Sequence, residues 1–264
     1  MRVALAFLRR DMLIWSSYRM AVVWQLLGIA VFIGMVYFLG TAIGDRRGLF
    51  EGQSTSFVAF VLSGITFTDV LMQGLFAMPQ AIRDNQKDGT LEPMLLTPIS
   101  TINLAISSTL FRLVIAFGRL IIYLVFGAVV IGLWHHVDLL SLIIVMASAM
   151  LGFLALGILS SAFVIFVKQG DPVLVAYGAL TALLGGVLFP VDALPSWIRP
   201  FADLIPLTYA LNGLRAALDG APPSQVLGPT LVLCGMAAVL MPFGILAFNW
   251  AVNRAKTEGS LAQY

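Results

Sequence analysis

The sequence has little charge and almost no cysteine. Of its 264 residues, 15 are Lys or Arg and 13 are Asp or Glu, which is 11% in all, whereas 60% are hydrophobic. Soluble domains are about 25% charged, and disordered chains are richer in charge and poorer in apolar residues, so both classes are excluded. The formal net charge is only +2 and the charges are scattered, so no nucleic acid partner is expected. The composition indicates a membrane protein.

Several chemical motifs are also missing. The one cysteine, Cys234, has no second thiol in the chain, so no disulfide or Cys-based metal site is expected within one chain. Because it lies in an apolar stretch, it is expected to be a small buried residue. There is no G-x-x-x-x-G-K-[ST] phosphate loop, so the chain is not expected to hydrolyse ATP. His135 and His136 stand near Asp138, but adjacent histidines rarely converge on one ion, so no metal site is predicted. No nucleophile–base pair, paired carboxylates or redox motif stands out.

Six apolar runs are long enough to cross the membrane as helices. Each has about 20 mostly apolar residues, the length that spans ~30 Å of hydrocarbon, and they cover residues 21–40, 56–79, 110–133, 140–167, 172–190 and 228–250. They predict an all-α polytopic membrane protein with a single transmembrane domain over residues 1–264. With six spans, nine of the 15 Lys and Arg residues share a side with both termini, and four lie opposite. The positive-inside rule therefore predicts a multi-pass protein of the cytoplasmic (inner) membrane with both termini in the cytoplasm.

Residues 1–19 precede the first span and are predicted to form a helix in the inner membrane interface. Leu5, Leu8, Met12 and Trp15 recur at helical spacing, while arginines fall off that stripe. A helix of this kind places its apolar side in lipid and its arginines at the headgroups, so membrane lipid is an expected partner. A cytoplasmic extension of the first span is the alternative.

The polar segment between the second and third spans, residues 81–101, predicts a docking element. Gly89 is expected to end one short helix in the left-handed conformation, Thr90 to cap the next, and Pro98 to stop it. The short rigid helix between them would present apolar side chains at Leu91, Met94 and Leu95. Exposed apolar residues on a rigid loop suit docking against another protein. A merely solvated loop is the alternative.

The apolar segment after the fifth span, residues 185–216, predicts broken helices. Four prolines within 17 residues forbid one continuous helix. Irregular backbone at membrane depth is tolerated only where protein or a watery cavity surrounds it. We therefore expect short re-entrant helices that dip in from the outer face and form a gate, with Trp197 as an interfacial anchor.

A few ionisable side chains interrupt the predicted spans. Asp69 and Gln73 lie one turn apart in the second, and Arg112 and Arg119 lie seven residues apart in the third. Because ionisable residues are costly in lipid, they are functional hypotheses by default, and Asp69, Gln73 and Arg119 form a candidate substrate path. The alternative for Asp69 is packing, through hydrogen bonds to Gln73, Thr66 or a neighbouring helix. The alternative for the arginines is structural, with Arg112 at the membrane boundary and Arg119 snorkelling or facing the bundle.

The two segments resemble the signatures of a known family. The first contains Gly89, Thr90, Leu91, Glu92, Leu95, Thr97, Pro98, Ile99 and Ser100, and the second contains Phe189, Pro190, Leu194, Pro195, Trp197, Pro206, Leu207, Thr208, Tyr209 and Arg215. With the predicted topology, these motifs are similar to those of type-2 ATP-binding-cassette (ABC) exporter permeases over nearly the whole chain. Members often carry an acidic residue ahead of the Gly-Thr pair; here both Asp84 and Asp88 are candidates.

The resemblance implies a permease subunit without catalytic residues or cofactors of its own. It would bind an ATPase subunit that carries ATP and Mg, and would pair with a second copy of itself or with a different permease. The coupling helix that docks on the ATPase would involve Gly89, Thr90, Leu91, Glu92, Met94, Leu95, Thr97 and Pro98, with Glu92 as the polar contact. The re-entrant gate would involve Gly186, Phe189, Pro190, Leu194, Pro195, Trp197, Pro206, Thr208, Tyr209 and Arg215.

The cargo is the least determined feature. Because the spans are almost wholly apolar, we expect a hydrophobic or amphipathic cargo, drug or lipid-like, and the resemblance implies outward export. Export of a lipid-linked glycan or polysaccharide by the same mechanism is the alternative within the family. The alternatives of another class are a membrane-embedded enzyme, for which only Asp69 with Gln73 supplies intramembrane polar groups, and a channel, for which no filter-like loop or charged ring is visible.

Overall fold

The protein is α-helical throughout the part that the structure, a computed structural model, describes: residues 2–17, 19–43, 57–87, 89, 100–130, 137–167 and 171–257. These residues contain no strand. The helices are α1 (Arg2–Ser17), α2 (Arg19–Ile43), α3 (Phe57–Lys87), α5 (Thr101–Val130), α6 (Leu139–Val167), α7 (Asp171–Leu184), η2 (Val191–Ala193), α8 (Arg199–Ala202), α9 (Pro206–Leu218) and α10 (Pro223–Thr257). The predicted all-α polytopic fold class is confirmed.

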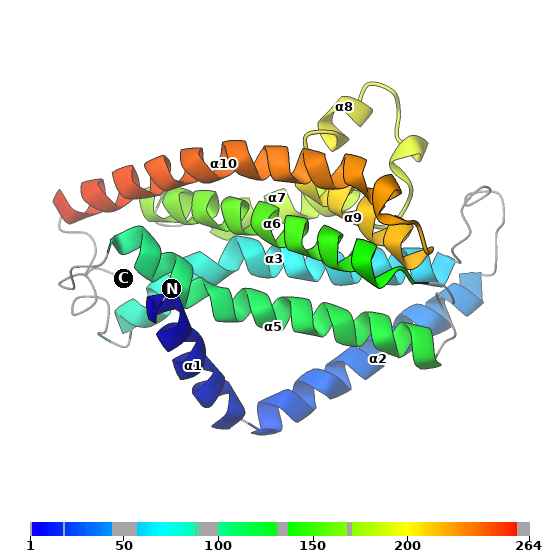
Figure 1. The fold of residues 1–264 in the computed structure, drawn as a ribbon, viewed down its shortest axis with the longest axis horizontal. Helices are drawn as coiled ribbons and strands as arrows, with labels where there is room; N and C mark the ends of the chain where they lie inside the picture. The colour runs from blue at the N-terminus through cyan, green and yellow to red at the C-terminus, as the bar shows by residue number, and fades with distance from the viewer. Residues whose placement is uncertain are drawn as a thin grey trace.

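Four helices, α3, α5, α6 and α10, are long and apolar enough to cross a membrane. They run side by side along the long axis of the molecule (Figure 1). Two shorter apolar stretches, Val23–Phe38 within α2 and Asp171–Leu184 of α7, lie where two further spans are predicted. The start of α1 and the end of α10 lie at the same end of the bundle (Figure 1), as an even number of crossings requires.

Helix α3 lies at the centre of the packing. It contacts α2, α5, α6, α7 and α9, and its fully buried Phe67 shares a core with Phe153 of α6 and Leu207 of α9. Small residues allow close backbone approach, as is usual between membrane helices: a Cβ added to Gly157 of α6 would lie 2.5 Å from the carbonyl oxygen of Gly74. A displacement of α3 would therefore act directly on five other helices.

The C-terminal end of α3 extends beyond its predicted limit. The sequence suggested a span that ends at residue 79 and a separate segment from residue 81, but the helix continues through Pro79 to Lys87. Ion pairs from Arg83 and Asp84 to neighbouring helices stabilise these added turns. Gly89 follows with φ of 64°, the left-handed conformation predicted for a helix end. The next helix, α5, begins at Thr101 rather than at residue 110.

Helix α7 is shorter than its predicted span of residues 172–190. It ends at Leu184, because the chain turns at Gly185 and Gly186, and Gly186 has φ of 81°, a conformation that strains other residues. At 1.5 Å per residue, α7 is roughly 21 Å long, less than the ~30 Å hydrocarbon core. By contrast, α10 extends beyond its predicted 228–250 to Pro223–Thr257.

Helices α1 and α2 form a V beside the four long helices, with α1 next to α5 (Figure 1). On α1, Leu5 and Met12 are exposed and Leu8 is half-buried. The apolar stripe of α1 is therefore partly exposed. The location of α1 in the membrane interface stays a prediction.

Candidate functional site

The structure brings together the candidate substrate-path residues. Oδ2 of Asp69 on α3 lies 2.7 Å from Nη2 of Arg119 on α5. Gln73, one turn further along α3, lies within hydrogen-bonding reach of the same carboxylate. Thr66 instead donates to the carbonyl oxygen of Leu62 in its own helix, at 2.7 Å. The Asp69 carboxylate is thus balanced by a cation on a neighbouring helix, a pairing that the sequence alone did not reveal.

Tyr123 is a further member of this site that the sequence-based predictions missed. It lies one turn beyond Arg119 on α5, close enough to interact electrostatically with both Asp69 and Arg119. Its ring packs edge-to-face on Phe32 of α2, with 5.8 Å between centroids. The available signal was the four-residue spacing from Arg119, which puts both side chains on one face of a helix.

A second ion pair joins the same two helices nearer the start of α5. Nη2 of Arg112 lies 2.6 Å from Oδ2 of Asp84, and its Nη1 donates to Oε1 of Gln80 at 3.3 Å. This pairing supports the structural interpretation of Arg112. It also engages Asp84 within the chain, whereas Asp88, the other candidate for the acidic signature residue, lies outside the described residues.

A third ion pair ties the end of α3 to the start of α7. Nη1 and Nη2 of Arg83 lie 2.5 and 2.6 Å from the two carboxylate oxygens of Asp171, a bidentate arrangement. The hydrogen bonds from Arg83 hold the pKa of Asp171 below its ordinary value. The end of α3 is therefore clamped to both α5 and α7 just before the predicted coupling helix.

Most of the predicted coupling helix lies outside the described residues, including Thr90, Leu91, Glu92, Met94, Leu95, Thr97 and Pro98. Gly89 is described and is exposed. Its φ of 64° is the left-handed conformation that is typical of the end of a helix. The roles assigned to these residues stay predictions.

The broken helices predicted between α7 and α10 are present. The chain runs through η2 and α8 before α9, which begins at Pro206. Two predicted gate residues fold α9 back on α8: Thr208 Oγ1 donates to the carbonyl oxygen of Ala202 at 2.9 Å, and the Tyr209 hydroxyl donates to that of Asp203 at 3.0 Å. Of the other gate residues, Gly186, Leu194 and Pro206 are buried, Phe189, Pro190 and Arg215 are half-buried, and Pro195 and Trp197 are exposed.

Arg215 of α9 holds this broken segment against α3. Its guanidinium donates to the carbonyl oxygens of Phe60 and Val187, at 3.2 and 3.4 Å, and to Ser63 Oγ at 3.4 Å. The guanidinium carbon also lies 3.5 Å from the ring centroid of Phe60, a cation–π contact. A Cβ added to Gly64 would lie only 2.3 Å from the carbonyl oxygen of Val187. The backbone of the segment therefore rests directly on the first turns of α3.

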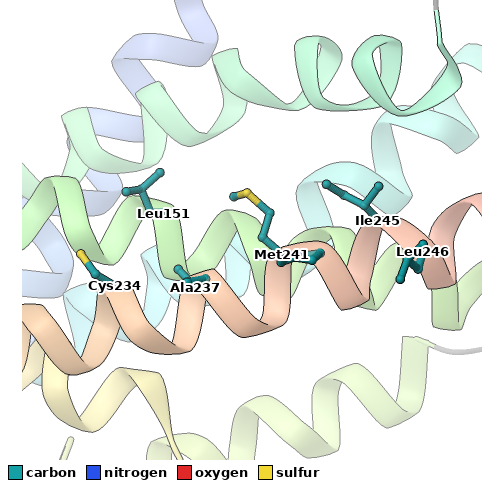
Figure 2. Close-up of a pocket in the computed structure, with 8 residues that line it drawn as sticks. Leu151, Cys234, Ala237, Met241, Ile245 and Leu246 are labelled. Atoms are coloured by element: carbon teal, nitrogen blue, oxygen red, sulfur yellow. The ribbon is translucent and has the colours of Figure 1, made fainter.

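An apolar groove of about 660 Å³ lies along α6 and α10. Figure 2 shows Leu151 of α6 beside the α10 side chains that line it; the full lining is Leu151, Cys234, Ala237, Ala238, Met241, Pro242, Ile245 and Leu246. Cys234 is exposed here rather than buried as predicted. The reason is that lipid-facing positions of a membrane helix are as apolar as buried ones, so hydropathy does not separate them.

The sequence features considered for metal binding have other roles or lie outside the description. No group of three His, Cys, Asp or Glu residues that could hold a metal occurs within the described ranges. His135 and His136 lie outside them. Asp138 accepts a hydrogen bond from the backbone N–H of Ser141 at 2.7 Å and so caps α6, which lowers the pKa of its carboxyl.

Apolar spans with an ion pair between them, and a helical segment broken at one end of the bundle, together define a polytopic membrane protein with a polar site inside its bundle. The family model for the ABC-2 type transporter matches residues 1–218, so the chain belongs to the ABC-2 type transporter family. It is 27% identical over 246 residues to Nodulation protein J of Rhizobium leguminosarum bv. viciae, and the match covers 90% of each chain. The predicted family is confirmed: the protein is a multi-pass transmembrane subunit of an ABC exporter, for which the family implies an ABC ATPase partner.

Proposed function

We propose that this permease moves a hydrophobic or amphipathic molecule, drug or lipid-like, outward across the cytoplasmic membrane. ATP is bound with Mg and hydrolysed on a separate subunit, and the path forms between two permease copies. Family membership carries this proposal and favours it over a membrane-embedded enzyme or a channel. The apolar faces of the four long helices support an apolar or amphipathic cargo.

The packing of α3 and α7 supports a specific coupling route. The ATPase would dock on the coupling helix, residues 89–98, directly after α3. Helices α3 and α7 are joined at one end by the Arg83–Asp171 ion pair. Midway along the two helices, a Cβ added to Gly178 of α7 would meet the side chain of Met72 of α3. At the other end, Gly64 of α3 supports the segment that follows α7. Closure of the ATPase subunits would therefore displace the coupling helix and the outer broken segment together.

The first experiment isolates the tagged protein gently from its native membrane. We expect a stoichiometric partner with Mg-dependent ATP hydrolysis in the purified sample. Leu95→Asp places a charge on the apolar docking surface and should abolish this partner's recovery, because a buried unpaired charge is strongly unfavourable. Glu92→Ala should leave membrane insertion intact but abolish coupled transport.

Ser100→Asp is the matched control. Ser100 is exposed directly before α5 and follows the residues assigned to the coupling helix, and Asp caps a helix as well as Ser does, so this variant adds a charge nearby in the sequence without changing a docking residue. It should retain the partner. Full transport by both Glu92→Ala and Leu95→Asp would remove the coupling-helix assignment, and no ATPase in any mild detergent would contradict the proposed function.

A further inference from the structure

The site around Asp69 and Arg119 has unused hydrogen-bonding capacity inside the bundle. Asp69 lies well within α3, and Arg119 well within α5. A carboxylate offers about four acceptor positions and a guanidinium five donors, yet the pair is joined through Nη2 and Oδ2. Nε of Arg119 is buried and has no hydrogen-bond partner within the described part of the chain. Because lipid supplies no hydrogen bonds, this capacity points to a polar ligand.

The site is also open enough to admit a ligand. The side chains of Asp69 and Arg119 are 36% and 22% exposed, although both lie far from the ends of their helices. Gln73 adds an amide beside the carboxylate, and Tyr123 adds a hydroxyl near both charges. An apolar cluster that includes Phe32, Ile33 of α2 and Phe126 lies beside Tyr123. The polar groups of the site thus lie beside an apolar surface, so the site can contact both the polar head and the apolar tail of an amphiphile.

The charges of the site select among polar head groups. The charges of the Asp69 carboxylate and the Arg119 guanidinium sum to zero. The amide of Gln73 and the phenol of Tyr123 are neutral. An anionic head would be drawn to Arg119 but repelled by Asp69, and a cationic head would meet the opposite problem. A neutral head that both donates and accepts hydrogen bonds satisfies Asp69 and Arg119 together, because it leaves the ion pair in balance.

We propose that Asp69, Gln73, Arg119 and Tyr123 form an intramembrane site for the head of an amphiphile that has no net charge and bears both hydrogen-bond donors and acceptors. This inference rests on the proposed transport function and specifies the cargo class that the function leaves open. Asp69 would accept from the head group, Arg119 would donate to it, and the tail would lie against the apolar cluster beside Tyr123.

The test uses three amphiphiles with the same dodecyl tail and different heads. Dodecyl maltoside is neutral with donors and acceptors, dodecyl phosphate is anionic, and dodecyltrimethylammonium is cationic. Each is titrated, below its micellar concentration, into the full-length protein in lipid nanodiscs, and bound amphiphile is counted by native mass spectrometry. We expect dodecyl maltoside to bind about tenfold more tightly than the other two, the ratio given by one well-placed charge-assisted hydrogen bond.

Three variants and a matched pair decide the outcome. Asp69→Asn and Arg119→Gln should each abolish the preference for dodecyl maltoside. Tyr123→Phe removes one hydroxyl, leaves the ion pair in place and should weaken dodecyl maltoside binding severalfold, so the test survives if the charge variants misfold. The control is Asp84→Asn with Arg112→Gln, which neutralises the other ion pair between α3 and α5 and should keep the full preference.

Equal binding of the three amphiphiles, or an unchanged preference in folded Asp69→Asn and Tyr123→Phe proteins, would overturn the proposal. The assay contains no ATPase. A failed head-group preference therefore leaves the coupling assignment standing, and a missing ATPase partner leaves the head-group result standing.

Discussion

Gly64 determines how closely the broken segment approaches α3. Its missing side chain lets the carbonyl oxygen of Val187 come within 2.3 Å of where a Cβ would be, a distance that atoms do not tolerate. Gly118, also inside a long helix, has nothing within 4 Å of its Cβ position. Two helical glycines in one protein thus have opposite structural requirements.

The first prediction compares these two positions. Gly64→Ala forces the segment away from α3 and should destabilise the protein by about 1–3 kcal/mol, as overpacking does in other cores. Gly118→Ala should be neutral or stabilise the protein by up to ~1 kcal/mol, because alanine is the better helix former. Thermal unfolding in nanodiscs measures both, and similar melting temperatures for the two variants would contradict the close approach at Gly64.

Residues that act locally could be predicted from the sequence, whereas residues that act across helices could not. Gly89 has a positive φ, as expected from its place between a polar run and the threonine that is predicted to cap the next helix. Gly64 gave no such signal, because its neighbour Val187 lies more than 100 residues away in the chain. Asp69 and Arg119 were both candidates for the substrate path, but their pairing depends on α3 and α5 being adjacent, which one sequence does not specify.

At the scale of helices, the pair formed by Arg83 and Asp171 is the contact best placed to make α3 and α7 move together. Arg83 lowers the pKa of Asp171. The pair therefore contributes its full stabilisation above 3.8, the ordinary pKa of the carboxyl, and loses it as the pH falls through the lowered value. At neutral pH the clamp is intact.

The second prediction reverses these charges. Arg83→Asp and Asp171→Arg each place like charges at the junction and should reduce transport, whereas the double variant should recover most of it by restoring the pair. Because the side chains are 32% and 41% exposed, the cost in stability should be at most about 1 kcal/mol. Thermal unfolding and transport are measured together.

The comparison separates coupling from mere stability. Transport in the single variants should fall by more than the loss of folded protein explains. If the double variant recovers no transport although it melts like the wild type, the pair does not link the two helices functionally.

Helix existence was predictable here, and helix length was less so. The long apolar runs of α6 and α10 gave two spans directly. The end of α3 was not predictable, because Pro79 is tolerated within the helix and ion pairs with distant residues support the turns beyond it. The prolines between α7 and α10 did predict a broken segment. Proline lacks the backbone N–H that a helix needs, and this effect does not depend on which residues lie nearby. How that segment is fixed to α3, through Arg215, required the structure.

At the scale of the whole molecule, the predicted orientation in the membrane rests on the distribution of charge. Nine Lys and Arg residues lie on the predicted cytoplasmic side and four on the other, and the start of α1 lies at the same end of the bundle as the end of α10 (Figure 1). Proposed ATPase docking requires the residues just before α5 to be cytoplasmic, while the turn between α9 and α10 must be outside.

The third prediction tests this arrangement with single thiols. Cys234→Ala removes the only cysteine, and Ser100→Cys or Pro222→Cys then places one thiol at an exposed position beside α5 or before α10. In intact spheroplasts, a membrane-impermeant maleimide should label Pro222→Cys at once and Ser100→Cys only after permeabilisation, because a charged reagent does not cross the bilayer.

Labelling of Ser100→Cys from outside would invert the molecule and place the coupling helix beyond the reach of any cytoplasmic ATPase. Labelling of both from one side would show that the chain between them crosses an even number of times, which requires a crossing count different from the three made by α5, α6 and α7. Of those three helices α7 is the shortest, so its crossing would be the one to re-examine.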